Sequence, residues 1–85
     1  MDIKINIPDY SRETGFLYKW EAGFELELHQ KNNSMELIAN KAGLISLANH
    51  LLNLAQDDVP LGYHLHFDEN NSLKEGSVEL IIQKI

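Results

Sequence analysis

Alternating hydrophobic and polar positions run through much of the chain and predict strands near both of its ends. Residues 2–7 alternate cleanly as far as Pro8, which predicts a first strand. Between Phe16 and His29 the even positions are apolar or aromatic and the odd positions are mostly polar. About fourteen extended residues would span about 45 Å, which is too long for a flat strand in so small a domain. A bend or bulge is therefore expected at Ala22-Gly23.

A hairpin followed by a helix is predicted in the middle of the chain. Residues 31–34 are rich in turn-forming types, so a strand at 35–39 should pair with residues 24–30. Asn40 is a suitable helix N-cap, and acidic residues followed by Pro60 end the helix. Apolar residues at helical spacing predict a stripe that packs under the sheet. The stripe comprises Leu44, Leu47, Ala48, Leu51, Leu54 and Ala55.

A second hairpin is predicted at the C-terminus, because residues 63–67 and 77–83 alternate and a polar loop at 68–76 separates them. The expected order is β-β-β-α-β-β. This order predicts one α+β domain over residues 1–85, with a mostly antiparallel sheet of about five strands and one helix packed on one face.

The composition excludes several classes of protein. Hydrophobic residues make up 44% and charged residues 24% of the chain, as in ordinary globular domains. Cysteine is absent, which excludes disulfides, thiolate chemistry and cysteine-ligated zinc. No apolar run approaches the roughly 18 residues of a membrane-spanning helix, and the first residues lack the features of a secretory signal. A soluble, cytoplasmic protein is expected.

The net charge of −6 bears on the kind of partner. Proteins that bind a nucleic-acid backbone or an anionic membrane usually carry a basic surface, so neither partner is expected. A basic protein is the partner that complements this charge. The acidity could also serve only to keep the domain soluble.

One face of the predicted sheet should be strongly acidic. Side chains alternate across a strand, so the neighbours of the core residues point to the opposite face. That face is either solvated or a docking surface, and it holds five acids and no lysine or arginine. Its residues are Glu25, Glu27, His29, Glu36, His64, His66, Asp68, Glu79 and Gln83, with Ile38 and Ile81 as the apolar members.

The sharpest local motif is His64-Leu65-His66-Phe67-Asp68. Residues two apart on a strand share one side, so two imidazoles and a carboxylate could converge on a metal ion. Exposed strands carry the same residue types without binding anything. A small metal-binding or ligand-binding domain that uses this strand is therefore the alternative to a partner-facing surface. We expect that folding depends on neither a metal nor another cofactor.

No enzyme motif is recognised. Ser46, Ser72 and Ser77 lack the surroundings of a nucleophile, and no glycine-rich phosphate loop is present. His50 fits a residue at the boundary of the helix stripe better than a general base. Tyr18 and Trp20 fit core or edge packing, with stacking on a ligand as the alternative. We expect no catalytic residues.

The C-terminal half of the chain resembles the immunity protein 32 family over residues 35–85. The most particular part of the resemblance is the run from Gly62 through His64 and His66 to Asp68, with Ser-x-Glu-Leu-Ile-Ile after the loop. The other matching positions are Gly43-Leu44, Leu47-Ala48, His50-Leu51, Leu54-Ala55, Val59-Pro60-Leu61, Tyr63, Leu65, Phe67 and Leu73. Members of that family are small bacterial proteins predicted to neutralise a cognate toxin in polymorphic toxin systems.

The resemblance implies an immunity protein that binds a toxin, and the charge argues for an acidic contact surface, because many toxin domains in such systems are basic. The acids lie on both sides of the strand at residues 63–67, from which the two histidines project. The expected partner-binding residues are Asp57, Asp58, His64, His66, Asp68 and Glu69. A structural subunit that completes its sheet face by self-association is a third reading, so the oligomeric state stays open.

Overall fold

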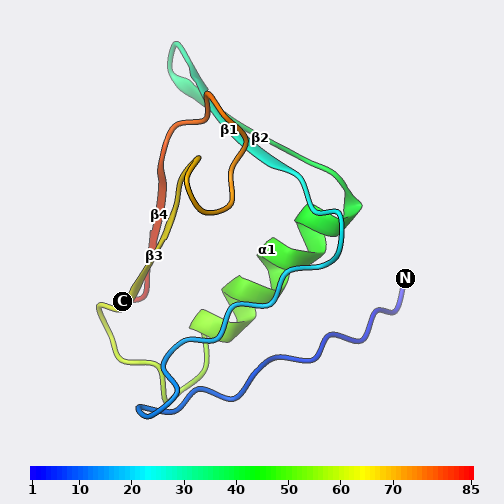
Figure 1. Ribbon diagram of the computed structural model, residues 1–85. Coiled ribbons are helices and arrows are strands. Elements are labelled where there is room, and N and C mark those ends of the chain that lie inside the picture. The colour runs from blue at the N-terminus through cyan, green and yellow to red at the C-terminus, as the bar shows by residue number, and fades with distance from the viewer.

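The fold consists of two antiparallel hairpins and one helix, preceded by a long extended N-terminal segment (Figure 1). The computed structural model describes all 85 residues, Met1–Ile85. The elements in chain order are β1 (Leu26–Lys31), β2 (Ser34–Ala39), α1 (Lys41–Leu54), β3 (His64–Phe67) and β4 (Leu80–Gln83). The α+β class is confirmed. The single sheet of about five strands is wrong, because the four strands form two separate two-stranded sheets, β1-β2 and β3-β4.

The N-terminal segment forms neither of its expected strands. Residues 2–7 and 16–20 pair with no strand, and the alternating stretch becomes a strand only from Leu26 onward, after a turn at Ala22-Gly23. The segment runs along α1, turns at residues 11–15 and returns along the helix in the opposite direction (Figure 1). The observed order is therefore β-β-α-β-β.

Polar side chains of α1 take the place of a neighbouring strand for this segment. Ser46, Asn49, His50 and Asn53 form a buried polar face of the helix, each at most 3% exposed. These four side chains form hydrogen bonds with main-chain groups of the segment. Asn49 Nδ2 donates to the Asn6 carbonyl (3.0 Å), and Asn53 Nδ2 donates to the Leu17 carbonyl (2.9 Å). His50 Nε2 accepts from the Lys19 amide (3.3 Å), and Ser46 Oγ accepts from the Glu21 amide (2.8 Å). The alternating pattern thus predicts the extended backbone correctly and its partner wrongly.

The predicted leucine stripe of the helix is largely turned outward. Leu44 and Leu51 are 54% and 44% exposed, and only Leu54 of the stripe is buried. Leu52 is exposed as well. The expectation that Leu51 lies under the sheet is wrong, because the interior side of α1 is the polar face that bonds to the N-terminal segment.

The first hairpin and the helix N-cap are confirmed. Strands β1 and β2 pair from Leu26↔Ala39 to Lys31↔Ser34, and Asn32 adopts the positive φ of 53° that the turn requires. The side chain of Asn40 accepts a hydrogen bond from the amide of Gly43 (2.8 Å), as an N-cap does. A Cβ on Gly43 would overlap the Glu25 carbonyl oxygen, so the helix can approach this close only with glycine there.

The C-terminal hairpin is confirmed, with β3 and β4 paired from His64↔Gln83 to Phe67↔Leu80. Its second strand begins three residues later than expected. The preceding residues instead lie along β1, where the amides of Lys74 and Val78 donate to the carbonyls of Leu26 and Leu28, each at 2.9 Å. These bonds join the two hairpins into one body.

The core lies where the two hairpins, the N-terminal segment and the end of α1 meet. It consists of Phe16, Leu26, Leu28, Leu54, Val59, Leu65, Phe67 and Leu73. Met35 and Leu37 of β2 are 55% and 39% exposed, so the helix does not cover the apolar side chains of this strand. No helix of the protein has both the length and the apolar character needed to cross a membrane.

A reciprocal pair of substitutions tests which face of α1 is buried. Asn53→Leu removes the donor to the Leu17 carbonyl and should destabilise the protein by about 1–3 kcal/mol. For a domain of this size the melting temperature should fall by about 5–20 °C. Leu51→Asn, on the exposed face, should cost less than about 1 kcal/mol. Thermal melts of both variants followed by circular dichroism would show the opposite ranking if the leucine stripe were the interior face.

Candidate functional site

The C-terminal hairpin presents an outer face that carries both histidines of the predicted motif. Leu65 and Phe67 point into the core, so His64 and His66 point outward and are exposed. Their ring centroids are 4.8 Å apart. The register places Gln83 opposite His64 and Ile81 opposite His66, so these four side chains share the face.

Asp68 does not join the two histidines. Its carboxylate accepts a hydrogen bond from the Asn70 amide (2.9 Å) and so shapes its own loop. His66 Nδ1 lies 3.4 Å from a carboxylate oxygen of Glu79, and His64 Nδ1 lies 3.2 Å from the Gly62 carbonyl oxygen. Nowhere in the protein do three or more histidine, cysteine, aspartate or glutamate residues gather in a way that could hold a metal ion.

Three exposed acids and the half-buried Asp68 flank β3 in the sequence, and the two lysines after position 60 make bonds elsewhere. Asp57 and Asp58 precede the strand and Asp68 and Glu69 follow it. Lys84 Nζ donates to the main-chain carbonyls of Gln56 (2.6 Å) and Val59 (2.9 Å). The other lysine after position 60, Lys74, forms an ion pair with the carboxylate of Glu25, with 2.7 Å between nitrogen and oxygen.

The ion pair between Lys74 and Glu25 shifts both groups toward their charged forms. The hydrogen bond and then the attraction between the charges lower the pKa of Glu25 and raise the pKa of Lys74. Both side chains are about half exposed, and the pair joins the residue before β1 to the loop before β4. The charge of Lys74 is thus compensated by Glu25 and not by the acids around β3.

The predicted acidic face is divided between the two hairpins. The register pairs Glu27 with Ile38 and His29 with Glu36, so these four share one side of β1-β2 as the alternation predicts. His64, His66, Glu79 and Gln83 belong to the region of β3 and β4. Because these hairpins are separate sheets, the acids do not form one continuous sheet face.

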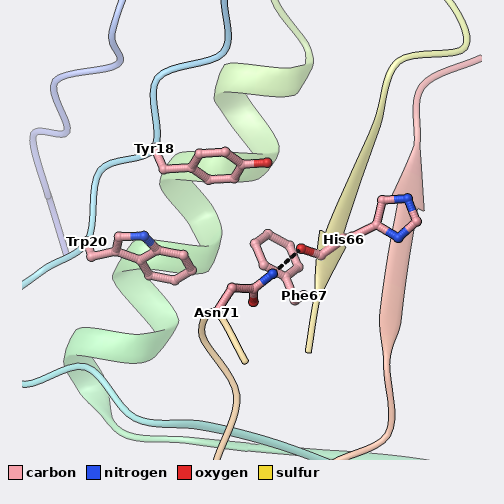
Figure 2. A pocket seen from close by; sticks show the side chains of 5 residues that line it. All are labelled: Tyr18, Trp20, His66, Phe67 and Asn71. Atoms are coloured by element: carbon pink, nitrogen blue, oxygen red, sulfur yellow. Dashed lines mark hydrogen bonds between the residues drawn. The ribbon is translucent and has the colours of Figure 1, made fainter. Parts of the chain in front are cut away.

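Three aromatic rings, Tyr18, Trp20 and Phe67, line a small hollow between the N-terminal segment and β3, and the buried His50 packs against all three. Tyr18 and Trp20 lie nearly parallel, with planes 3° apart and centroids separated by 6.4 Å. Phe67 stands at 82° and 80° to them, and His50 at 74° and 76°. Figure 2 shows Tyr18 and Trp20 projecting from one segment toward Phe67 and Asn71, while the imidazole of His66 points away. The hollow has a volume of about 180 Å³.

His50 is a fully buried residue of this cluster and not the boundary residue that its position in the helix suggested. The Lys19 amide donates to Nε2, so that nitrogen carries a lone pair and the proton of the neutral ring is on Nδ1. Nδ1 is buried and has no hydrogen-bond partner. Burial lowers the pKa of His50, against the smaller opposite effect of the Lys19 amide. His50 is therefore neutral at pH 7.

Two features escaped the sequence reading: the polar interior face of α1 and the apolar face opposite it. The signal was present, since residues 42–56 contain no charged side chain on any side of the helix. A surface helix usually carries charged residues on the face opposite its apolar stripe, and this helix carries none there. Its leucine stripe alone therefore does not identify the buried face.

Acid should weaken the protein through His50. The unfolded side chain takes up a proton as the pH falls below 6.5, whereas the folded side chain resists protonation because its pKa is lowered. The stability linked to His50 is complete above pH 6.5 and is lost as the pH falls. Between pH 7 and pH 5 the melting temperature should fall less in His50→Gln than in the wild type. His64→Gln, at an exposed histidine, is the control and should keep the wild-type dependence; equal slopes for all three proteins would contradict the account.

Removing metals should leave the fold intact. His64, His66 and Asp68 do not converge, so folding should not depend on a bound ion. We expect the same melting curve with and without excess EDTA. A loss of more than several degrees would instead favour the metal-binding alternative, and metal analysis of the untreated protein would identify the ion.

A comparison of the sequence with known protein families finds a match that covers the C-terminal part of the chain. The family model for immunity protein 32 matches residues 34–85, which hold β2, α1, β3 and β4. No curated protein and no solved structure matches the chain. The match covers more than half of the chain and includes both acidic ends of β3. The chain belongs to the immunity protein 32 family.

Proposed function

We propose that this protein acts in the cytoplasm as an immunity protein, binding and neutralising a cognate bacterial toxin through the acidic outer face of its C-terminal hairpin. It acts by binding and not by catalysis. The toxin surface it fits is basic. The residues proposed to contact the toxin are Asp57, Asp58, His64, His66, Asp68 and Glu69.

The observation that carries the proposal is the unbalanced charge of the hairpin in a member of this family. Lys74 and Lys84, the two lysines after position 60, are held by a carboxylate and by main-chain carbonyls. The carbonyls do not neutralise Lys84, which lies at the turn that carries Asp57 and Asp58, so the four acids at the two ends of β3 face one lysine and the region stays negative. A negative patch of this kind attracts a basic partner and accelerates its encounter.

The centre of the same face has the character of an interface core. Between the acidic ends lie the two imidazoles, Gln83 and Ile81, which is 52% exposed. Protein interfaces commonly place few charges at the centre and keep polar and charged groups at the rim. Contacts at the centre control dissociation, whereas the rim charges control association.

Charge reversal at the rim should slow binding without unfolding the protein. Asp57→Lys with Asp58→Lys should lower the association rate for the toxin encoded beside this protein and flatten its dependence on salt. Asp9→Lys with Glu13→Lys, at exposed acids of the N-terminal segment, makes the same change in net charge and is the control. Stopped-flow binding at two salt concentrations separates the two pairs. Equal rates for both pairs would place the docking surface elsewhere.

The central histidines give the second arm of the same experiment. His64→Ala with His66→Ala should raise the dissociation rate, by a factor that corresponds to about 2 kcal/mol if both are desolvated. Asp68 and Glu69 accept main-chain hydrogen bonds within their loop, so Asn and Gln are the substitutions that remove their charge and keep an acceptor. If the wild-type protein neither co-purifies with the toxin nor protects cells that express it, the proposal is wrong.

A further inference from the structure

We infer that the small hollow lined by the rings of Tyr18, Trp20 and Phe67, which we call the aromatic slot, receives a cationic side chain, an arginine or a lysine, of the protein that this domain binds. The inference rests on the proposed function for the identity of that protein. It names a binding site outside the acidic hairpin face and the chemical group that fills it.

The slot is walled by aromatic rings. Tyr18 and Trp20 line it with planes parallel within 3° and centroids 6.4 Å apart. The two planes are therefore at most 6.4 Å apart, less than the about 7 Å that a group in contact with both faces requires, so the guest occupies the hollow beside the rings and not the space between them. Phe16 packs against Tyr18 at 4.9 Å and Phe24 against Trp20 at 4.4 Å. Aromatic neighbours therefore hold both rings of the slot in place.

The inner side of the slot is also aromatic. Phe67 and His50 stand nearly perpendicular to both rings of the slot, and His50 is fully buried. Asn71 lies at the hollow and is held in place, since its amide donates to the His66 carbonyl (3.0 Å) and its carbonyl oxygen accepts from the Asp68 amide (3.0 Å) (Figure 2). At about 180 Å³ the hollow is smaller than the about 300–1,000 Å³ of small-molecule pockets, and it suits the end of one side chain.

Charge selects a cation as the guest. The faces of aromatic rings carry partial negative charge and attract ammonium or guanidinium groups, most strongly at tryptophan. No lysine or arginine lines the hollow, including Lys19, which lies between the two aromatic residues in sequence. His50 packs against the aromatic rings of the hollow, and because burial lowers its pKa it adds no positive charge there at pH 7. The loop that supplies Asn71 also carries Asp68 and Glu69, and the whole protein has a charge of −6.

The test uses Trp20 as its own reporter, because it is the only tryptophan of the chain. We expect N-acetyl-arginine amide to produce a saturable shift of the Trp20 indole N–H signal in NMR spectra at millimolar concentrations. N-acetyl-citrulline amide has nearly the same shape without the charge and should produce no saturable shift. An equal response to both compounds, or no response to the arginine derivative, would overturn the inference.

Variants at Tyr18, which is 46% exposed, separate the ring from its hydroxyl group. Tyr18→Phe keeps the ring and should retain the arginine response. Tyr18→Leu should weaken it about tenfold, which corresponds to about 1.4 kcal/mol. Tyr10→Leu changes a tyrosine that does not line the hollow and serves as the control. A wild-type response in Tyr18→Leu, with an unchanged melting curve, would overturn the inference.

The toxin complex provides a readout that separates this inference from the proposed function. If the wild type binds the toxin, Tyr18→Leu should bind it about tenfold more weakly and Tyr18→Phe should bind it normally. Normal binding by Tyr18→Leu would overturn the inference and leave the proposed function standing. Failure of the wild type to bind would overturn the proposed function, while the arginine titration would still decide whether the slot accepts a cation.

Discussion

The structure depends on the hydrogen bonds between the polar face of α1 and the backbone of the N-terminal segment. Partly buried backbone amides and carbonyls must find partners, and here side chains at positions 46, 49, 50 and 53 supply them. The segment passes along the helix twice without pairing to a strand. This single constraint fixes which side of the helix is interior and where the aromatic residues of the segment lie.

Two surfaces follow from that constraint. Because the polar face is turned inward, Leu44, Leu51 and Leu52 are left on the outside of α1. The Lys19 amide donates a hydrogen bond to His50, which holds the neighbouring residues Tyr18 and Trp20 beside that histidine. Both of their rings contact the imidazole. The bond that anchors the segment therefore also builds the aromatic slot.

The sequence predicted the local structures whose partners are near in the chain and failed where the partner is distant. Both hairpins and the Asn40 cap follow from alternation, turn residues and a side chain that bonds three residues ahead. The strand at residues 2–7 was wrong because alternation predicts extended backbone without saying what bonds to it. The helix face was wrong because Ser46, Asn49, His50 and Asn53 have the same helical spacing as the leucines.

The candidate site was predictable in kind but not in arrangement. Exposed histidines on β3 and acids at its ends follow from the sequence, whereas the aromatic slot needs the contact between residues 18–20 and β3, which no local pattern specifies.

Charges on the hairpin act over a distance of about 8–10 Å in salt and favour encounter with many basic proteins. If the hollow of about 180 Å³ receives one side chain as we infer, it would discriminate among them. The two surfaces together would give an immunity protein fast capture from the acids and selectivity from the rings.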